Sequence, residues 1–196
     1  MEKLKNREKS SGPENPADSF IFKIGLADVI RLTMFGTLIS VSRFVFQMPI
    51  GVPGHTSVYW MGLLMLGKGL IPRFGAGTIM GIVSGILAIV FGLGKEGPLM
   101  AFKCLIPGML LDILALIFFN KLESIWVGII IGALISWSKL LTSIALGIIL
   151  DIPMVFLAMG FGYATLLHVV FGAAGGVLAA VLIKRLKPRL SASWQN

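Results

Sequence analysis

Long apolar segments, separated by short breaks rich in glycine and proline, fill the chain from Ala27 to Ile183. A helix that crosses a lipid bilayer needs about 20 predominantly apolar residues, and somewhat fewer where it is sheltered by protein. The pattern therefore predicts an all-α membrane protein with six transmembrane helices. The predicted spans are Ala27–Phe46, His55–Leu70, Ala76–Leu93, Pro98–Phe119, Ser124–Leu150 and Pro153–Ile183.

Composition supports this division of the chain. Hydrophobic residues make up 56% of the sequence and charged residues only 13%, whereas a soluble domain carries about 25% charged residues. The polar start and the basic end lie outside the apolar region. We therefore expect a disordered polar tail over residues 1–19, a six-helix transmembrane domain over 20–185 and a basic C-terminal end over 186–196.

The net charge of +8 is distributed unevenly among the breaks. Basic residues gather at the two ends of the chain and in every second connection, and the other connections carry almost none except Lys95. This asymmetry is typical of cytoplasmic segments under the positive-inside rule. It predicts a multi-pass protein of the cell membrane with both termini in the cytoplasm. Because topology accounts for the charge, no nucleic-acid partner is expected.

Several kinds of chemistry lack their usual residues. The chain has no glycine-rich phosphate loop ending in Lys-Ser or Lys-Thr, and no room for an ATPase domain. Its single cysteine, Cys104, and its two histidines form no metal-binding motif. We expect no cofactor, no metal and no enzymatic activity, so movement of a solute would depend on a gradient or on a partner.

Ionisable residues inside spans are costly and are candidates for function. Arg43, Lys103 and Lys139 fall in the predicted outer half of the bundle. The even-numbered helices begin on the same side, and helix N-termini favour anions. The sequence thus predicts a small anionic or carboxylate-bearing ligand captured from outside. The candidate binding residues are Arg43, His55, Lys95, Glu96, Lys103, Trp137 and Lys139. The structural alternative is that the lysines reach the headgroups or form bridges with Glu96 and Asp151.

Two further features concern packing. Asp112 and His168 fall at similar depths in the fourth and sixth spans, so we expect them to form a structural pair. The first span carries Gly36-x-x-x-Ser40, and small residues at this spacing let helices approach closely. We expect the other small-residue seams to serve internal packing and the Gly36–Ser40 seam to dock a partner.

The stretches Val52-Pro-Gly-His-Thr-Ser-Val-Tyr-Trp60, Gly75-Ala-Gly-Thr-Ile-Met-Gly81 and Gly94-Lys-Glu-Gly97 resemble the substrate-binding S components of energy-coupling factor (ECF) transporters. The resemblance covers Ala27 to Ile183. It implies a complex with a transmembrane T component and two cytoplasmic ATPases, and a ligand pocket near the outer face. Gly36 and Ser40 stand where the family usually has Ala-x-x-x-Ala. The start Met1-Glu2-Lys3 differs from the Met-His start of nickel and cobalt members, so an organic vitamin or precursor is expected.

Three other functions stay open. A gradient-driven carrier or channel would normally show internal repeats or broken helices, and no convincing repeat is present. A membrane scaffold would need no ligand at all. An intramembrane serine protease of rhomboid type would need a Gly-x-Ser-Gly turn and a late histidine; Ser84-Gly85 and His168 are present, but position 82 is Ile.

Overall fold

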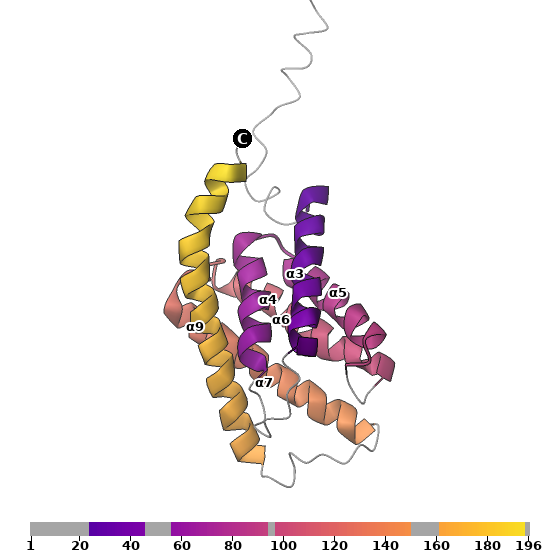
Figure 1. The fold of residues 1–196 in the computed structure, drawn as a ribbon. Coiled ribbons are helices and arrows are strands. Elements are labelled where there is room, and N and C mark those ends of the chain that lie inside the picture. Colours follow the sequence, from indigo (N-terminus) through magenta and orange to yellow (C-terminus); the bar gives the residue numbers. More distant parts are fainter. Residues whose placement is uncertain (1–23, 46–55, 94–96, 150–160, 195–196) are drawn as a thin grey trace, which may run out of the picture.

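The computed structural model describes residues 24–45, 56–93, 97–149 and 161–194. Within these ranges the chain is α-helical, with one short 3-10 turn and no strand (Figure 1). The elements are α3 (Leu26–Val45), α4 (Ser57–Leu70), α5 (Ala76–Val90), η1 (Gly97–Leu99), α6 (Met100–Ile117), α7 (Ile125–Ile149) and α9 (Phe161–Trp194). Each predicted span overlaps one of these helices, so the all-α fold class is confirmed. The predicted tail over residues 1–19 lies outside the described residues.

Three of the helices are long and apolar enough to cross a membrane. They cover Gly97–Ile117, Ile125–Ile149 and Gly162–Pro188, and α5 is a shorter apolar helix. The full count of six spans and the cytoplasmic position of both termini stay predictions. Helix α9 continues beyond its predicted end at Ile183, through the basic residues Lys184, Arg185 and Lys187, to Trp194. The C-terminal basic residues before Gln195 are therefore the last turns of a helix.

The helices pack as a bundle in which some helices that are not consecutive in sequence are also spatial neighbours. Helix α3 packs against α5 and α4, α5 against α6, α6 against α7, and both α7 and α4 against α9. Figure 1 shows α7 crossing the bundle obliquely behind α4 and α9. Helix α4 is buried along most of its length, from Ser57 to Gly69. A helix that is apolar on all sides is expected in such an interior position.

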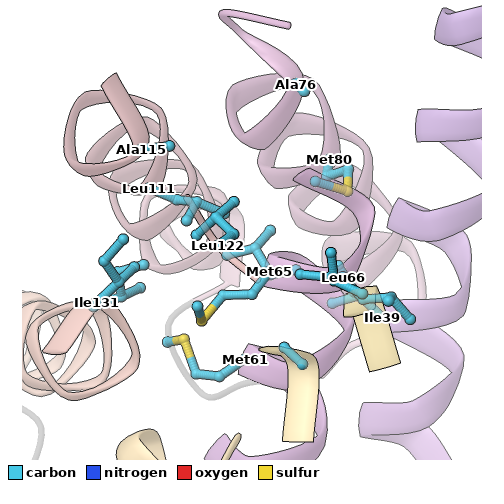
Figure 2. Packing of buried hydrophobic residues seen from close by; sticks show 14 of the residues in the cluster. Ile39, Met61, Met65, Leu66, Ala76, Met80, Leu111, Ala115, Leu122 and Ile131 are labelled. Atoms are coloured by element: carbon cyan, nitrogen blue, oxygen red, sulfur yellow. The ribbon is translucent and has the colours of Figure 1, made fainter. Parts of the chain in front are cut away.

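The main core lies around α4. Met61 and Met65 are fully buried, and Figure 2 shows their side chains extending toward Ile131 of α7 and Leu122. Met80 of α5 and Ile39 of α3 lie on the other side of α4. Flexible methionine side chains suit the irregular space between helices that cross at different angles. The core therefore joins α3, α5, α6, α7 and α9 to one central helix.

The Gly36–Ser40 seam of α3 faces inward. A Cβ atom on Gly36 would lie 2.8 Å from Cβ of Val83 in α5. Ser40 is fully buried and donates a hydrogen bond of 2.9 Å to the carbonyl oxygen of Ser84. The prediction that this seam docks a partner is wrong, because α5 occupies it. The seam does bring two helices close together, as small residues at this spacing do.

Helices α5 and α6 touch through their backbones, which yields a prediction about Gly108. A Cβ atom on Gly108 would lie 2.5 Å from the carbonyl oxygen of Gly77. Alanine favours helix formation over glycine by about 1 kcal/mol, but overpacking a tight contact typically costs about 1–3 kcal/mol. We therefore expect Gly108→Ala to lower the resistance of the protein to unfolding by SDS. Gly162, whose Cβ would meet nothing within 4 Å, provides the control: Gly162→Ala should be neutral or stabilising. Equal behaviour of the two variants would contradict this packing.

Candidate functional site

The centre of the candidate site is the ammonium group of Lys139 in the middle of α7. The residue is only 9% exposed, and its Nζ atom lies over the ring of Trp60 on α4, 4.7 Å from the ring centroid. Among the described residues, no carboxylate forms a salt bridge with Lys139. A buried charge is normally paired, because its removal from water is costly. The contact with the aromatic ring offsets part of this cost, and no carboxylate of the described residues acts as a counter-ion for Lys139.

Two more cations approach Lys139 from other helices. Arg43 of α3 and Lys103 of α6 lie within electrostatic range of its ammonium group. The guanidinium of Arg43 donates from Nη1 to Sγ of the buried Cys104, at 3.0 Å. The structure thus brings together Arg43, Lys103 and Lys139, as the sequence predicted. Three positive groups that converge from three helices attract an anion.

Helix α4 adds two buried polar groups to the same region. Ser57 and Trp60 are fully buried, and within the described part of the chain neither the Ser57 hydroxyl nor the Trp60 indole nitrogen has a hydrogen-bond partner. The two residues are three positions apart and therefore lie on one face of the helix. Buried donors without partners are rare in native proteins. Together with the ammonium of Lys139, they give this region hydrogen-bond donors that suit the oxygen atoms of an anion.

Helix α9 contributes His168. This residue is 7% exposed, its Nδ1 atom lies 3.4 Å from the hydroxyl of Ser136, and it is within electrostatic range of Lys139. The predicted pair of Asp112 and His168 is therefore wrong. His168 belongs to the neighbourhood of the basic cluster, between α7 and α9.

The carboxylate of Asp112 has a different partner. It forms a salt bridge of 2.7 Å with Lys68 of α4, and both side chains are 2% exposed. It also accepts hydrogen bonds from the backbone amides of Gly77 and Thr78, at 3.0 and 2.8 Å, and from the Thr78 hydroxyl at 2.8 Å. Lys68 donates a second bond of 2.6 Å to the carbonyl oxygen of Arg73. Through these contacts Asp112 connects α6 to α4 and to the start of α5.

Trp137 does not join the site. Its side chain is 41% exposed on the outside of α7. The physical reason is helical geometry, since two residues at 100° each place it roughly opposite Lys139 around the helix. Trp60 is the aromatic residue that contacts the lysine. The remaining predicted binding residues, His55, Lys95 and Glu96, lie outside the described residues.

Sequence reasoning missed Ser57 and Trp60 as site residues and Lys68 as the partner of Asp112. The apolar run of α4 has no polar stripe that would show which side faces Lys139, so no periodicity could single out Trp60. The pairing of Lys68 with Asp112 could have been predicted from the sequence. An intramembrane carboxylate needs a cationic partner, and Lys68 is the one basic residue of α4.

The fold and site together define a helical protein with membrane-spanning character and a buried basic centre around Lys139. No family model matches the chain, and no curated protein or solved structure is significantly similar to it.

Proposed function

We propose that this protein binds a small organic anion within its helical bundle. The observation that carries the proposal is the buried ammonium of Lys139, which has an aromatic contact but no carboxylate partner in the described chain. A ligand carboxylate would supply the missing charge. Arg43 and Lys103 add to the attraction, and the donors of Ser57 and Trp60 can bond to ligand oxygens. The aromatic ring of Trp60 provides a flat apolar wall, so a ligand with a planar or apolar body is favoured.

We further propose that binding serves uptake, with this chain as the substrate-capture S component of an ECF-type importer in the cell membrane. The similarity in local sequence to S components and the single small helical domain support this assignment. The chain would then work with a transmembrane T component and two ATPases, and its ligand would be a vitamin or a cofactor precursor taken from the outer side. A gradient-driven carrier is the alternative that the experiment below separates from this one.

The first test is to purify the full chain alone in a neutral detergent, after expression in rich medium, and to identify co-purified small molecules by mass spectrometry. We expect one organic acid at near-stoichiometric amounts in the wild-type protein. Recovery of no ligand, together with no calorimetric binding from a panel of carboxylate-bearing vitamins and their precursors, would contradict the proposed binding function.

Uptake of the identified ligand then separates the two transport mechanisms. In cells that lack other uptake routes, we expect accumulation only when a T component and its ATPases are co-expressed with this chain. A protonophore should have little immediate effect if ATP is kept constant. Accumulation by the chain alone, abolished by the protonophore, would favour the gradient-driven carrier and contradict the ECF assignment.

A further inference from the structure

A cavity lies between the start of α7 and the second half of α9. It has a volume of about 680 Å³ and is lined by Glu123, Ser124, Ile125, Trp126, Ala180, Val181, Lys184 and Arg185. None of these residues belongs to the cluster around Lys139. The cavity is therefore a separate feature, and its chemistry has to be explained independently.

The charge of this cavity is positive. Lys184 and Arg185 are exposed and form no ion pair within the described part of the chain. The single acidic residue of the lining, Glu123, forms an ion pair with Lys187. The negative charge of Glu123 is therefore balanced by Lys187, which does not line the cavity. The positive charges of Lys184 and Arg185 are therefore suited to bind the phosphate group of a ligand.

Apart from Ser124, the rest of the lining is apolar. Ile125 is 49% exposed and Trp126 76% exposed, at the first turn of α7. Ala180 and Val181 form the facing wall on α9. A free phosphate ion would gain nothing from these surfaces, whereas a phospholipid would place its glycerol and upper acyl region against them.

The position of the cavity along α9 matches the depth at which a lipid headgroup would lie in a bilayer. The apolar run from Gly162 to Ile183 is roughly 33 Å long at 1.5 Å per residue, and the hydrocarbon core of a bilayer is about 30 Å thick. Lys184 and Arg185 follow directly after this run. Gly128 of α7 lies against Gly176 and Ala180 of α9, which places Trp126 near the same level. Exposed tryptophan is typical of the membrane interface.

We propose that this cavity binds the headgroup of an anionic phospholipid, with Lys184 and Arg185 on the phosphate and Trp126 and Val181 against the glycerol and acyl region. Basic cavities between transmembrane helices on the cytoplasmic side are suited to such headgroups. A bound lipid would occupy the groove between α7 and α9 and strengthen the contact between these helices at the membrane surface.

Native mass spectrometry of the full chain in neutral detergent tests this proposal. The probes are phosphatidylglycerol and phosphatidylcholine with identical acyl chains, together with glycerol 3-phosphate as the soluble source of the same phosphate chemistry. We expect the wild-type protein to retain phosphatidylglycerol in preference to phosphatidylcholine. The Lys184→Gln/Arg185→Gln variant should bind phosphatidylglycerol about thirtyfold more weakly, because each basic contact near an anionic headgroup is worth roughly a factor of five to six in affinity.

Lys121 provides the matched control, since it is an exposed basic residue at the same end of the bundle but does not line the cavity. Lys121→Gln should bind phosphatidylglycerol as the wild type does, and Lys184→Arg/Arg185→Lys should also bind it. Equal binding of the two lipids by the wild type would overturn the proposal, and so would unchanged binding by the double glutamine variant. Glycerol 3-phosphate that binds as tightly as phosphatidylglycerol would overturn the assignment to a lipid.

Discussion

Replacing Asp112 by alanine is expected to destabilise the protein by about 3–5 kcal/mol, the cost of removing one partner from a buried ion pair. The change leaves the ammonium of Lys68 without its carboxylate in a site where both side chains are 2% exposed. It also removes the acceptor of the Gly77 and Thr78 backbone amides at the start of α5. Unfolding by SDS titration, followed by circular dichroism, measures the effect.

The control for Asp112→Ala is Glu123→Ala. Glu123 also forms an ion pair, with Lys187, but its side chain is 44% exposed. An exposed pair is worth about 0–1 kcal/mol, so this variant should unfold almost as the wild type does. The Lys68→Met/Asp112→Ala variant should be less destabilised than the sum of the two single variants, because the residues are in contact. A loss for Asp112→Ala as small as that for Glu123→Ala would show that this salt bridge does not hold α4, α5 and α6 together.

Replacing Lys139 by methionine is expected to stabilise the ligand-free protein by about 1–3 kcal/mol. Methionine has a similar length and flexibility, and it removes a buried charge that has no ionic partner in the described chain. Replacing buried ionic groups with apolar ones of similar volume is often neutral or stabilising. The lost contact with Trp60 reduces this gain by about 1 kcal/mol. The measurement is SDS unfolding of protein stripped of ligand.

Lys121→Met is the matched control for Lys139→Met, because Lys121 is exposed. A surface substitution of this kind changes stability by at most about 0.5 kcal/mol. Residues kept for binding at the expense of stability are common at functional sites. If Lys139→Met instead destabilised the stripped protein strongly, Lys139 would be a structural residue, and the basic cluster would lose its main argument for a ligand.

Most helices of this protein could be predicted from its sequence with little error, the exception being α9, which ends at Trp194 and not at the predicted Ile183. Apolar runs and glycine or proline breaks located α3, α4, α5, α6 and α7 to within a few residues of their observed ends. What the pattern could not show is which side of each helix faces inward. In a membrane-spanning helix both the lipid-facing and the buried sides are apolar, so the contrast that orients a surface helix in water is missing. The inward-facing seam of Gly36 and Ser40 was misassigned for this reason.

The candidate site could likewise be predicted only in part. Arg43, Lys103 and Lys139 could be predicted as a group because charges are rare inside spans and all three fall in the predicted outer half of the bundle. Trp137 was chosen because it is close to Lys139 in sequence, but helical geometry turns it outward. The true aromatic neighbour, Trp60, comes from α4 and depends on how α4 and α7 pack. The partner of Asp112 likewise depends on helix order, which the sequence does not encode in any local pattern.

The most direct test of the ligand site is calorimetry with the organic acid identified by mass spectrometry and with its uncharged primary amide. If Lys139 supplies the counter-charge, the wild-type protein should bind the acid at least about thirtyfold more tightly than the amide, as expected for a charge-assisted hydrogen bond. In Lys139→Met this preference should largely disappear, while Lys121→Met should keep it. If the wild type bound the acid and the amide equally well, or if Lys139→Met kept the full preference for the acid, the account of this protein as an anion-binding protein centred on Lys139 would be wrong.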